Sequence, residues 1–130
     1  MKTAFLATAA SVILMTSAAM AQDQASAGDP ARGAKIFRMC MACHTIKKGA
    51  PNRIGPNLHG VVGRKIASVP GFNYSPALKK HQGVWDEKTL DAWLANPRKF
   101  APGNRMAFAG VRRPQDRKDL IAYLKSMSED

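Results

Sequence analysis

The run Cys40-Met41-Ala42-Cys43-His44 is the part of this sequence that decides its fold and its chemistry. Two cysteines separated by two residues lie within one helical turn, so both thiols can form thioethers with the two vinyl groups of one haem. The histidine that follows directly can give an imidazole nitrogen to the haem iron. The run therefore predicts one haem c, covalently attached through Cys40 and Cys43, with His44 as an iron ligand.

Other uses of the cysteines are weaker explanations. A structural zinc site needs four ligands, usually from two paired motifs, and this chain has one cysteine pair. A thioredoxin-type dithiol sits where a strand meets a helix, and no strand pattern precedes Cys40. A disulfide framework is excluded, because a bond between Cys40 and Cys43 would close a very small loop and constrain the unfolded chain little.

Helical patterns lie on both sides of this run, and a long loop-rich section separates them. Asp29-Pro30 can begin a helix over about 30–40, Asp86 can cap a second that ends at Asn96-Pro97, and a third begins at Pro114. The stretch 45–84 is rich in glycine and proline, which precludes a long regular element and suggests loops wrapped around a bound group. No strand alternation appears, so we expect an all-α single domain in which three to four helices and long loops surround one haem.

The first 21 residues have the features of a secretory signal peptide. Lys2 gives the charged end, an apolar run covers 4–14, and Ala19-Met20-Ala21 matches the small-x-small cleavage pattern. A membrane anchor is the weaker explanation, because Ser11 and later hydroxyl residues interrupt a run that already falls short of a span. We therefore expect a signal peptide over 1–21, a mature domain over 22–130, and export to the periplasm.

Haem iron accepts a second axial ligand, and Met106 is the best candidate for it. It follows Pro102-Gly103-Asn104-Arg105 on a loop that is free to approach a metal. The other methionines and histidines of the mature chain have simpler explanations. Met39 and Met41 flank the cysteines, and Met127 belongs to the apolar stripe of the last helix. His59 and His81 are better explained as polar loop residues.

Five segments, at 40–45, 55–60, 70–75, 102–110 and 120–125, carry a resemblance to a known family. From residue 28 to residue 125 the chain resembles the class I c-type cytochromes, of the mitochondrial cytochrome c and bacterial cytochrome c2 kind. The resemblance implies that the carbonyl of Pro56 accepts a hydrogen bond from His44. It also implies that the haem propionates are hydrogen-bonded by Arg64, Tyr74 and Trp85, and that the first helix crosses the last one at Gly33 and Phe37.

Three positions depart from the common pattern of that family. Trp93 stands where many members carry a tyrosine whose hydroxyl reaches the axial methionine, and Leu78 and Asn104 replace other hydrogen-bonding residues. We therefore expect the polar surroundings of Met106 to differ from those of the family. With histidine and methionine as ligands, the midpoint potential is expected to be positive.

The most direct function for such a site is the transport of single electrons. With His44 and Met106 both on the iron, no position is open to a substrate, so the protein is expected to be an electron carrier and not an enzyme. The alternatives are a haem enzyme subunit and a gas-binding haem protein, and both need a vacant sixth position. A peroxidase would also want a distal His/Arg pair, which the loop around Met106 lacks.

Net charge indicates the kind of partner. The chain carries 20 Lys and Arg against 9 Asp and Glu, a formal charge of +11, but export makes nucleic acid an improbable partner. The resemblance implies that several cations ring the exposed haem edge: Arg38, Arg53, Arg98, Lys99, Arg105, Arg112 and Arg113. We expect a monomer that docks transiently on acidic faces of membrane-bound or periplasmic redox proteins: a bc1-type complex, an oxidase, a reaction centre or a dehydrogenase.

Overall fold

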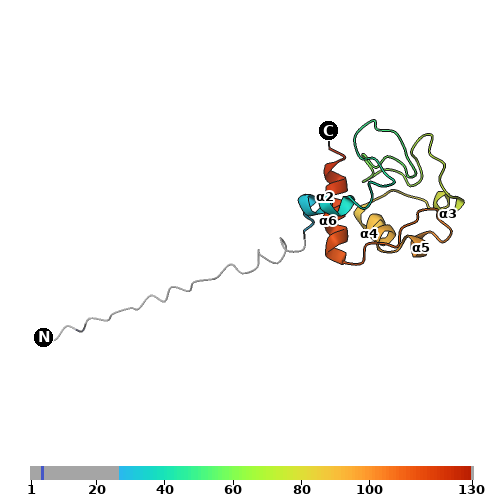
Figure 1. Ribbon diagram of the computed structural model, residues 1–130. Coiled ribbons are helices and arrows are strands. Elements are labelled where there is room, and N and C mark those ends of the chain that lie inside the picture. The colour runs from blue at the N-terminus through green and yellow to red at the C-terminus, as the bar shows by residue number, and fades with distance from the viewer. Residues whose placement is uncertain (1–3, 5–26, 130) are drawn as a thin grey trace.

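The computed structural model describes Ala4 and residues 27–129, so the predicted signal peptide lies, apart from Ala4, outside the described residues. The described helices are α2 (Pro30–Phe37), α3 (Pro76–Lys79), α4 (Glu87–Ala95), α5 (Pro97–Phe100) and α6 (Pro114–Ser126) (Figure 1). Over this part of the chain the only β pairing is one isolated bridge between Lys65 and Val84. The all-α prediction is therefore confirmed. None of the helices in 27–129 is long and apolar enough to cross a membrane.

Helix α2 begins where its capping residues predict. The side chain of Asp29 accepts a hydrogen bond from the amide of Ala31 at 2.8 Å, and Pro30 occupies the first helical position. The helix ends at Phe37, earlier than the predicted end at Cys40. Beyond it the amide of Cys40 bonds to the carbonyl of Phe37 at 2.8 Å, a three-residue spacing that tightens the chain into turns.

Helices α2 and α6 cross in close contact, as the family resemblance implied (Figure 1). At Gly33 an added Cβ would overlap the backbone carbonyl of Asp119 and lie 2.7 Å from the Cβ of Tyr123. The ring of Phe37 lies 5.3 Å from that of Tyr123, and Phe37 and Leu120 are among the most deeply buried side chains. The glycine thus lets the two backbones approach until the apolar side chains on either side of it are packed.

A buried carboxylate joins the same two helices. Asp119 is 1% exposed, and it accepts hydrogen bonds from Arg32 Nε at 2.9 Å, from the amide of Asp29 at 2.8 Å and from Gln115 Nε2 at 3.0 Å. Burial alone would raise the pKa of Asp119, but these hydrogen bonds and the charge of Arg32 outweigh it and hold the pKa below its usual value. The carboxylate is therefore charged at neutral pH and fixes how α2 begins against α6.

Two one-turn helices were not expected from the sequence. Ser75 caps α3 by accepting a hydrogen bond from the amide of Leu78 at 3.1 Å, and Asn96 caps α5 by accepting one from Lys99 at 3.0 Å. In both places a polar cap is followed by proline, which is a good helix start as well as a break in what precedes it. Asn96-Pro97 therefore ends α4, as predicted, and begins α5 at the same point.

Candidate haem site

The two cysteines and the histidine lie on one turn directly after α2. The amides of Cys43 and His44 both bond to the carbonyl of Cys40, at 3.1 and 2.9 Å, so the run folds back on itself. Both cysteines are free and half-buried. The predicted arrangement, with two thiols and one imidazole supplied by a single turn, is therefore present.

The environment of the thiols does not suit the alternative uses of a cysteine pair. Burial, together with the neighbouring Cys43, raises the pKa of Cys40 to about 11, whereas dithiol oxidoreductases depend on a lowered thiol pKa. Among residues 27–129 no three His, Cys, Asp or Glu side chains gather closely enough to hold a metal ion, and a structural zinc site needs four ligands. A thioether-forming role is the one that fits this pair of half-buried thiols.

The ring of His44 is held in one orientation. Its Nδ1–H donates to the carbonyl of Pro56 at 2.7 Å, because a carbonyl can only accept, and this leaves Nε2 as the nitrogen that can bind a metal. Gly55 packs closely against the ring, since a Cβ added at residue 55 would lie 2.6 Å from Nδ1 and 2.8 Å from Nε2. Burial lowers the pKa of His44, so the imidazole is neutral, although the bond to Pro56 acts the other way. The contact between His44 and Pro56 that the resemblance implied is present.

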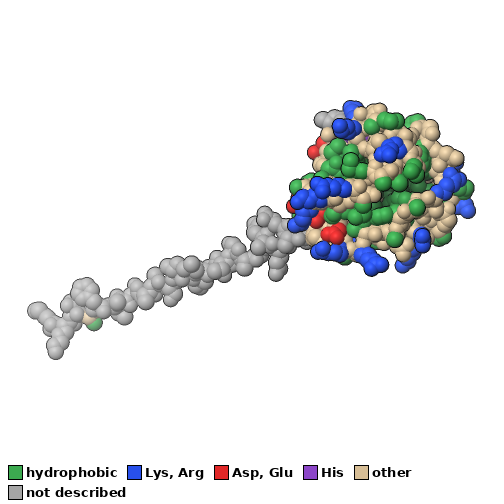
Figure 2. All heavy atoms as spheres, viewed as in Figure 1, with side chains coloured by type: hydrophobic (Ala, Val, Ile, Leu, Met, Phe, Trp, Pro, Cys, Tyr) green, Lys and Arg blue, Asp and Glu red, His purple; other side chains and the backbone are tan. Residues whose placement is uncertain are grey.

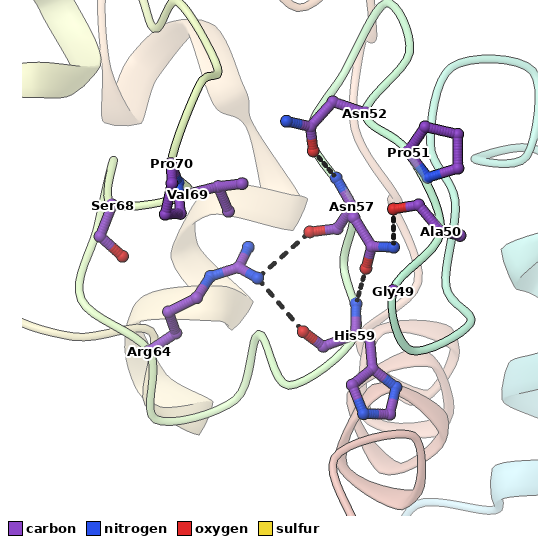
Figure 3. A pocket seen from close by; sticks show the side chains of 10 residues that line it. All are labelled: Gly49, Ala50, Pro51, Asn52, Asn57, His59, Arg64, Ser68, Val69 and Pro70. Carbon is purple, nitrogen blue, oxygen red and sulfur yellow. Dashed lines mark hydrogen bonds between the residues drawn. The ribbon is translucent and has the colours of Figure 1, made fainter.

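Arg64 lies in a pocket whose loop residues Figure 3 labels. Its Nη1 donates to the carbonyls of Asn57 at 3.1 Å and His59 at 3.2 Å. Its Nε is buried without any hydrogen-bond partner. A buried guanidinium nitrogen without an acceptor is costly, so this orphan donor fits an anionic oxygen such as a haem carboxylate.

Tyr74 and Trp85, which the resemblance assigns to the haem propionates together with Arg64, lie close to that arginine. The backbone of Trp85 bonds to that of Arg64 at 2.8 Å and to that of Gly63 at 2.8 Å, which holds the buried indole beside the arginine. The hydroxyl oxygen of Tyr74 accepts from the amide of Val69 at 3.0 Å, so its proton remains available for another acceptor. Burial raises the pKa of Tyr74, although Val69 and Arg64 lower it, and the phenol is therefore neutral.

Met106 is half-buried on the loop between α5 and α6. Its carbonyl accepts a hydrogen bond from the amide of Phe108 at 2.9 Å. Three other candidates have their own places in the fold. Met127 forms the C-cap of α6, His59 bonds through Nδ1 to the carbonyl of Ile46 at 3.2 Å, and His81 stacks on Phe100 with ring centroids 4.2 Å apart.

The three departures from the family pattern have distinct surroundings. Trp93 joins an aromatic cluster, with ring centroids 5.6 Å from both Trp85 and Phe100. Leu78 is buried in the apolar core. Asn104 alone brings polar atoms to Met106, because its Oδ1 accepts a hydrogen bond from the amide of Met106 at 2.9 Å. The expectation that the polar surroundings of Met106 differ from those of the family stays a prediction.

Asn57 is a structural residue of the site that the sequence reasoning did not single out. Its Nδ2 donates to the carbonyls of Lys47 at 2.9 Å and Ala50 at 2.8 Å, and its Oδ1 accepts from the amide of His59 at 2.7 Å. These bonds close the loop that carries Pro56. An asparagine after Gly-Pro in a loop is a recognisable signal for such a side-chain turn.

Large apolar side chains are exposed on part of the protein surface. Figure 2 shows a band of hydrophobic side chains crossing the visible face, with Lys and Arg side chains spread around it. Met39, Met41 and Ile54 are 54%, 53% and 79% exposed around the cysteine turn. Exposed apolar side chains on this scale indicate a surface that is covered by a bound group or a partner.

Known proteins match the chain over most of its length. The family model for cytochrome c matches residues 30–128. The chain belongs to the cytochrome c family. It is 47% identical over 104 residues to a cytochrome c of Nigella damascena, covering 79% of this chain and 94% of that one. It is 47% identical over 104 residues to a cytochrome c-550 of Ancylobacter novellus, covering 78% and 97%. A cytochrome c2 of Rhodomicrobium vannielii is 48% identical over 99 residues, covering 76% and 79%.

Membership of this family settles the cofactor and the broad role. The chain is an electron carrier with one covalent haem c, and Cys40 and Cys43 provide the attachment motif. The residues present fit that group on two independent observations. The imidazole of His44 is neutral, oriented and pressed against Gly55, and the buried Nε of Arg64 lacks an acceptor that a haem carboxylate would provide.

Proposed function

We propose that this cytochrome carries single electrons between redox proteins of the periplasm through a haem c ligated by His44 and Met106. The observation that carries the proposal is the turn after α2, where two free thiols lie beside an imidazole fixed by a 2.7 Å bond to Pro56. The bound haem supplies the redox couple, in which iron alternates between the ferric and ferrous states. The chain fixes the ligands, so that little rearrangement accompanies each transfer.

Met106 is proposed as the second ligand because the alternatives are otherwise occupied. His81 is stacked on Phe100, and His59 bonds to a backbone carbonyl. Met127 forms the C-cap of α6, at the end of the apolar stripe of that helix. A filled sixth position leaves no site for a substrate, which is why electron transfer is favoured over an enzyme or a gas-binding protein.

Arg64, Tyr74 and Trp85 are proposed to hold the haem propionates. Two of these side chains have N–H or O–H groups that donate to no acceptor among the described residues, and this supports the proposal. Arg64 keeps a buried Nε without a partner, and Tyr74 keeps its hydroxyl proton. A cation and a neutral hydroxyl near a buried carboxylate offset its charge, so the propionates can be held out of water.

The proposed location is the periplasm, reached with a signal peptide over 1–21 and a mature domain over 22–130. Support comes from Lys2, the apolar run at 4–14 and the pattern Ala19-Met20-Ala21. Mass spectrometry of the exported haem protein tests this: we expect a mature chain that begins at Gln22. A haem protein that retains Met1 would overturn the assignment.

The proposed partners are redox proteins with acidic docking faces, bound transiently by a monomer. The support is the distribution of charge along the sequence. No Asp or Glu occurs at 30–85 or at 92–115, and both stretches carry many Lys and Arg. The acidic residues are confined to the start of α2 and to α4, α6 and their flanks in the described structure. These two basic stretches without acidic residues steer the protein toward anionic faces. Such steering speeds encounter more than it tightens binding.

The ligation is tested by comparing Met106→Ala with the matched control Met127→Ala in the complete haem protein. We expect reduced Met106→Ala to bind carbon monoxide promptly and with a clear spectral shift, because its sixth position is open. Reduced wild type and Met127→Ala should show no such shift. If wild type binds the gas as readily as Met106→Ala, the proposed ligation is wrong. An enzyme or a gas-binding role is then favoured instead.

A further inference from the structure

The geometry points to Asn104 as the positioning residue that holds the Met106 loop closed, in a way particular to this chain. The inference rests on the proposed role of Met106 as a ligand. Asn104 is half-buried, and its side-chain amide makes three hydrogen bonds. Oδ1 accepts from the amide of Met106 at 2.9 Å, and Nδ2 donates to the carbonyls of Pro97 at 2.9 Å and Ala101 at 3.0 Å.

These three bonds connect Met106 to the end of helix α5. Pro97 is the first residue of α5 and Ala101 is its C-cap, so Nδ2 adds a hydrogen bond to a carbonyl at each end of this four-residue helix. The carbonyl of Pro97 also accepts from the amide of Ala101 at 2.9 Å. The backbone amide of Asn104 also bonds to the carbonyl of Ala101, at 2.9 Å. The side chain therefore serves as a clamp: one end holds a short helix and the other holds the backbone of Met106.

Only a short amide side chain can make this set of bonds. It needs one acceptor for an N–H and two donors for two carbonyls, all within reach of the Asn104 backbone. Aspartate would keep the acceptor for Met106 but has no donor for Pro97 or Ala101. Alanine would lose all three bonds. The two substitutions therefore separate the end of the clamp at Met106 from its end at α5.

The chain beyond Met106 is anchored independently of Asn104. The amide of Phe108 bonds to the carbonyl of Met106 at 2.9 Å, and the amide of Val111 bonds to the carbonyl of Leu94 in α4 at 2.7 Å. Loss of the clamp would thus free the loop on one side only. The protein should keep its fold while Met106 leaves its position more often, which an external ligand for the iron can detect.

The test is the affinity of the complete ferric protein for imidazole, which competes with Met106 for the iron. We expect Asn104→Ala to bind imidazole at least about tenfold more tightly than wild type, since three hydrogen bonds that hold the loop are lost. Amide hydrogen exchange of Met106 should accelerate in the same variant. In Asn104→Asp, exchange at Met106 should remain slow compared with Asn104→Ala, because the acceptor is retained.

Asn96→Ala is the matched control, because it removes one hydrogen bond at the exposed N-cap of α5 without touching Met106. It should lower overall stability and leave imidazole affinity unchanged. An equal gain of affinity in Asn96→Ala and Asn104→Ala would show general loosening of α5 and overturn the inference. An Asn104→Ala variant with wild-type affinity and wild-type exchange at Met106 would also overturn it.

Failure of this inference can be told apart from failure of the proposed ligation. Met106→Ala measured beside these variants sets the affinity of an open site. If wild type already binds imidazole as tightly as Met106→Ala, the ligation itself is wrong and the clamp has no ligand to position. If wild type binds far more weakly than Met106→Ala and Asn104→Ala matches wild type, only the role of Asn104 is wrong.

Discussion

Replacement of Gly55 by alanine tests how the chain orients His44. A Cβ at residue 55 would lie 2.6 Å from Nδ1 and 2.8 Å from Nε2 of the ring, well inside ordinary van der Waals contact. Gly55 is not among the residues with positive φ, so its backbone can accept alanine without strain. Cε1 of the ring is nearer still, so the ring must move by about 1 Å to restore normal contact, and this stretches the 2.7 Å bond to Pro56.

The cost can be estimated from these two effects. Crowding of a packed side chain costs about 1–3 kcal/mol, and loss of a hydrogen bond costs about 0.5–1.5 kcal/mol. The alanine also restricts the unfolded chain, which returns about 0.4–1 kcal/mol. We expect Gly55→Ala to lower the free energy of unfolding by about 2–3 kcal/mol.

Denaturant unfolding of the ferric haem protein, combined with a redox titration, measures both consequences. Gly33→Ala is the control, since it crowds the contact between α2 and α6 and leaves His44 untouched. Both variants should lose stability, and only Gly55→Ala should also change the absorption spectrum and the midpoint potential, because the bond to Pro56 sets the basicity of the proposed ligand. A Gly55→Ala protein with the wild-type spectrum and a stability within about 0.5 kcal/mol of wild type would refute the reasoning.

Three further outcomes are expected. Gly33→Ala should destabilise the protein by about 2 kcal/mol in urea unfolding, because its Cβ meets the backbone of Asp119, which cannot move aside as a side chain can. Asp119→Asn should cost about 2–3 kcal/mol at pH 7, measured by the same method. The pKa of Asp119 is lowered in the folded state, so its charge stabilises the fold above the unfolded pKa, and the difference from wild type should shrink as pH falls below about 4. Oxidation by ferricyanide, an anion, should slow as salt is added, and oxidation by a cationic cobalt complex should accelerate; equal salt dependence, measured by stopped flow, would contradict steering by the basic surface.

Much of the fold could be predicted from local signals. Asp29-Pro30 and Asp86 mark the starts of α2 and α4, and the cysteine run fixes where the haem attaches. The family resemblance added the contact between His44 and Pro56, which is confirmed at 2.7 Å. These features depend on residues that lie close together in the chain, so their spacing carries the information.

Features in which a side chain bonds to backbone atoms of a loop were not predictable. The Nη1 of Arg64 bonds to the carbonyls of Asn57 and His59, and a carbonyl leaves no mark in the sequence. The clamp made by Asn104 likewise ends on the carbonyl of Ala101 and the amide of Met106. Only the departure of Asn104 from the family pattern indicated that its surroundings needed a different explanation.

The optical spectrum of the purified protein, oxidised and then reduced, with and without carbon monoxide, tests the central claim most directly. With His44 and Met106 on the iron, the reduced spectrum should be that of a low-spin haem and should not change when the gas is added. A prompt shift on adding carbon monoxide would mean that the sixth position is open. It would contradict the proposal that this cytochrome carries electrons through a closed His/Met site.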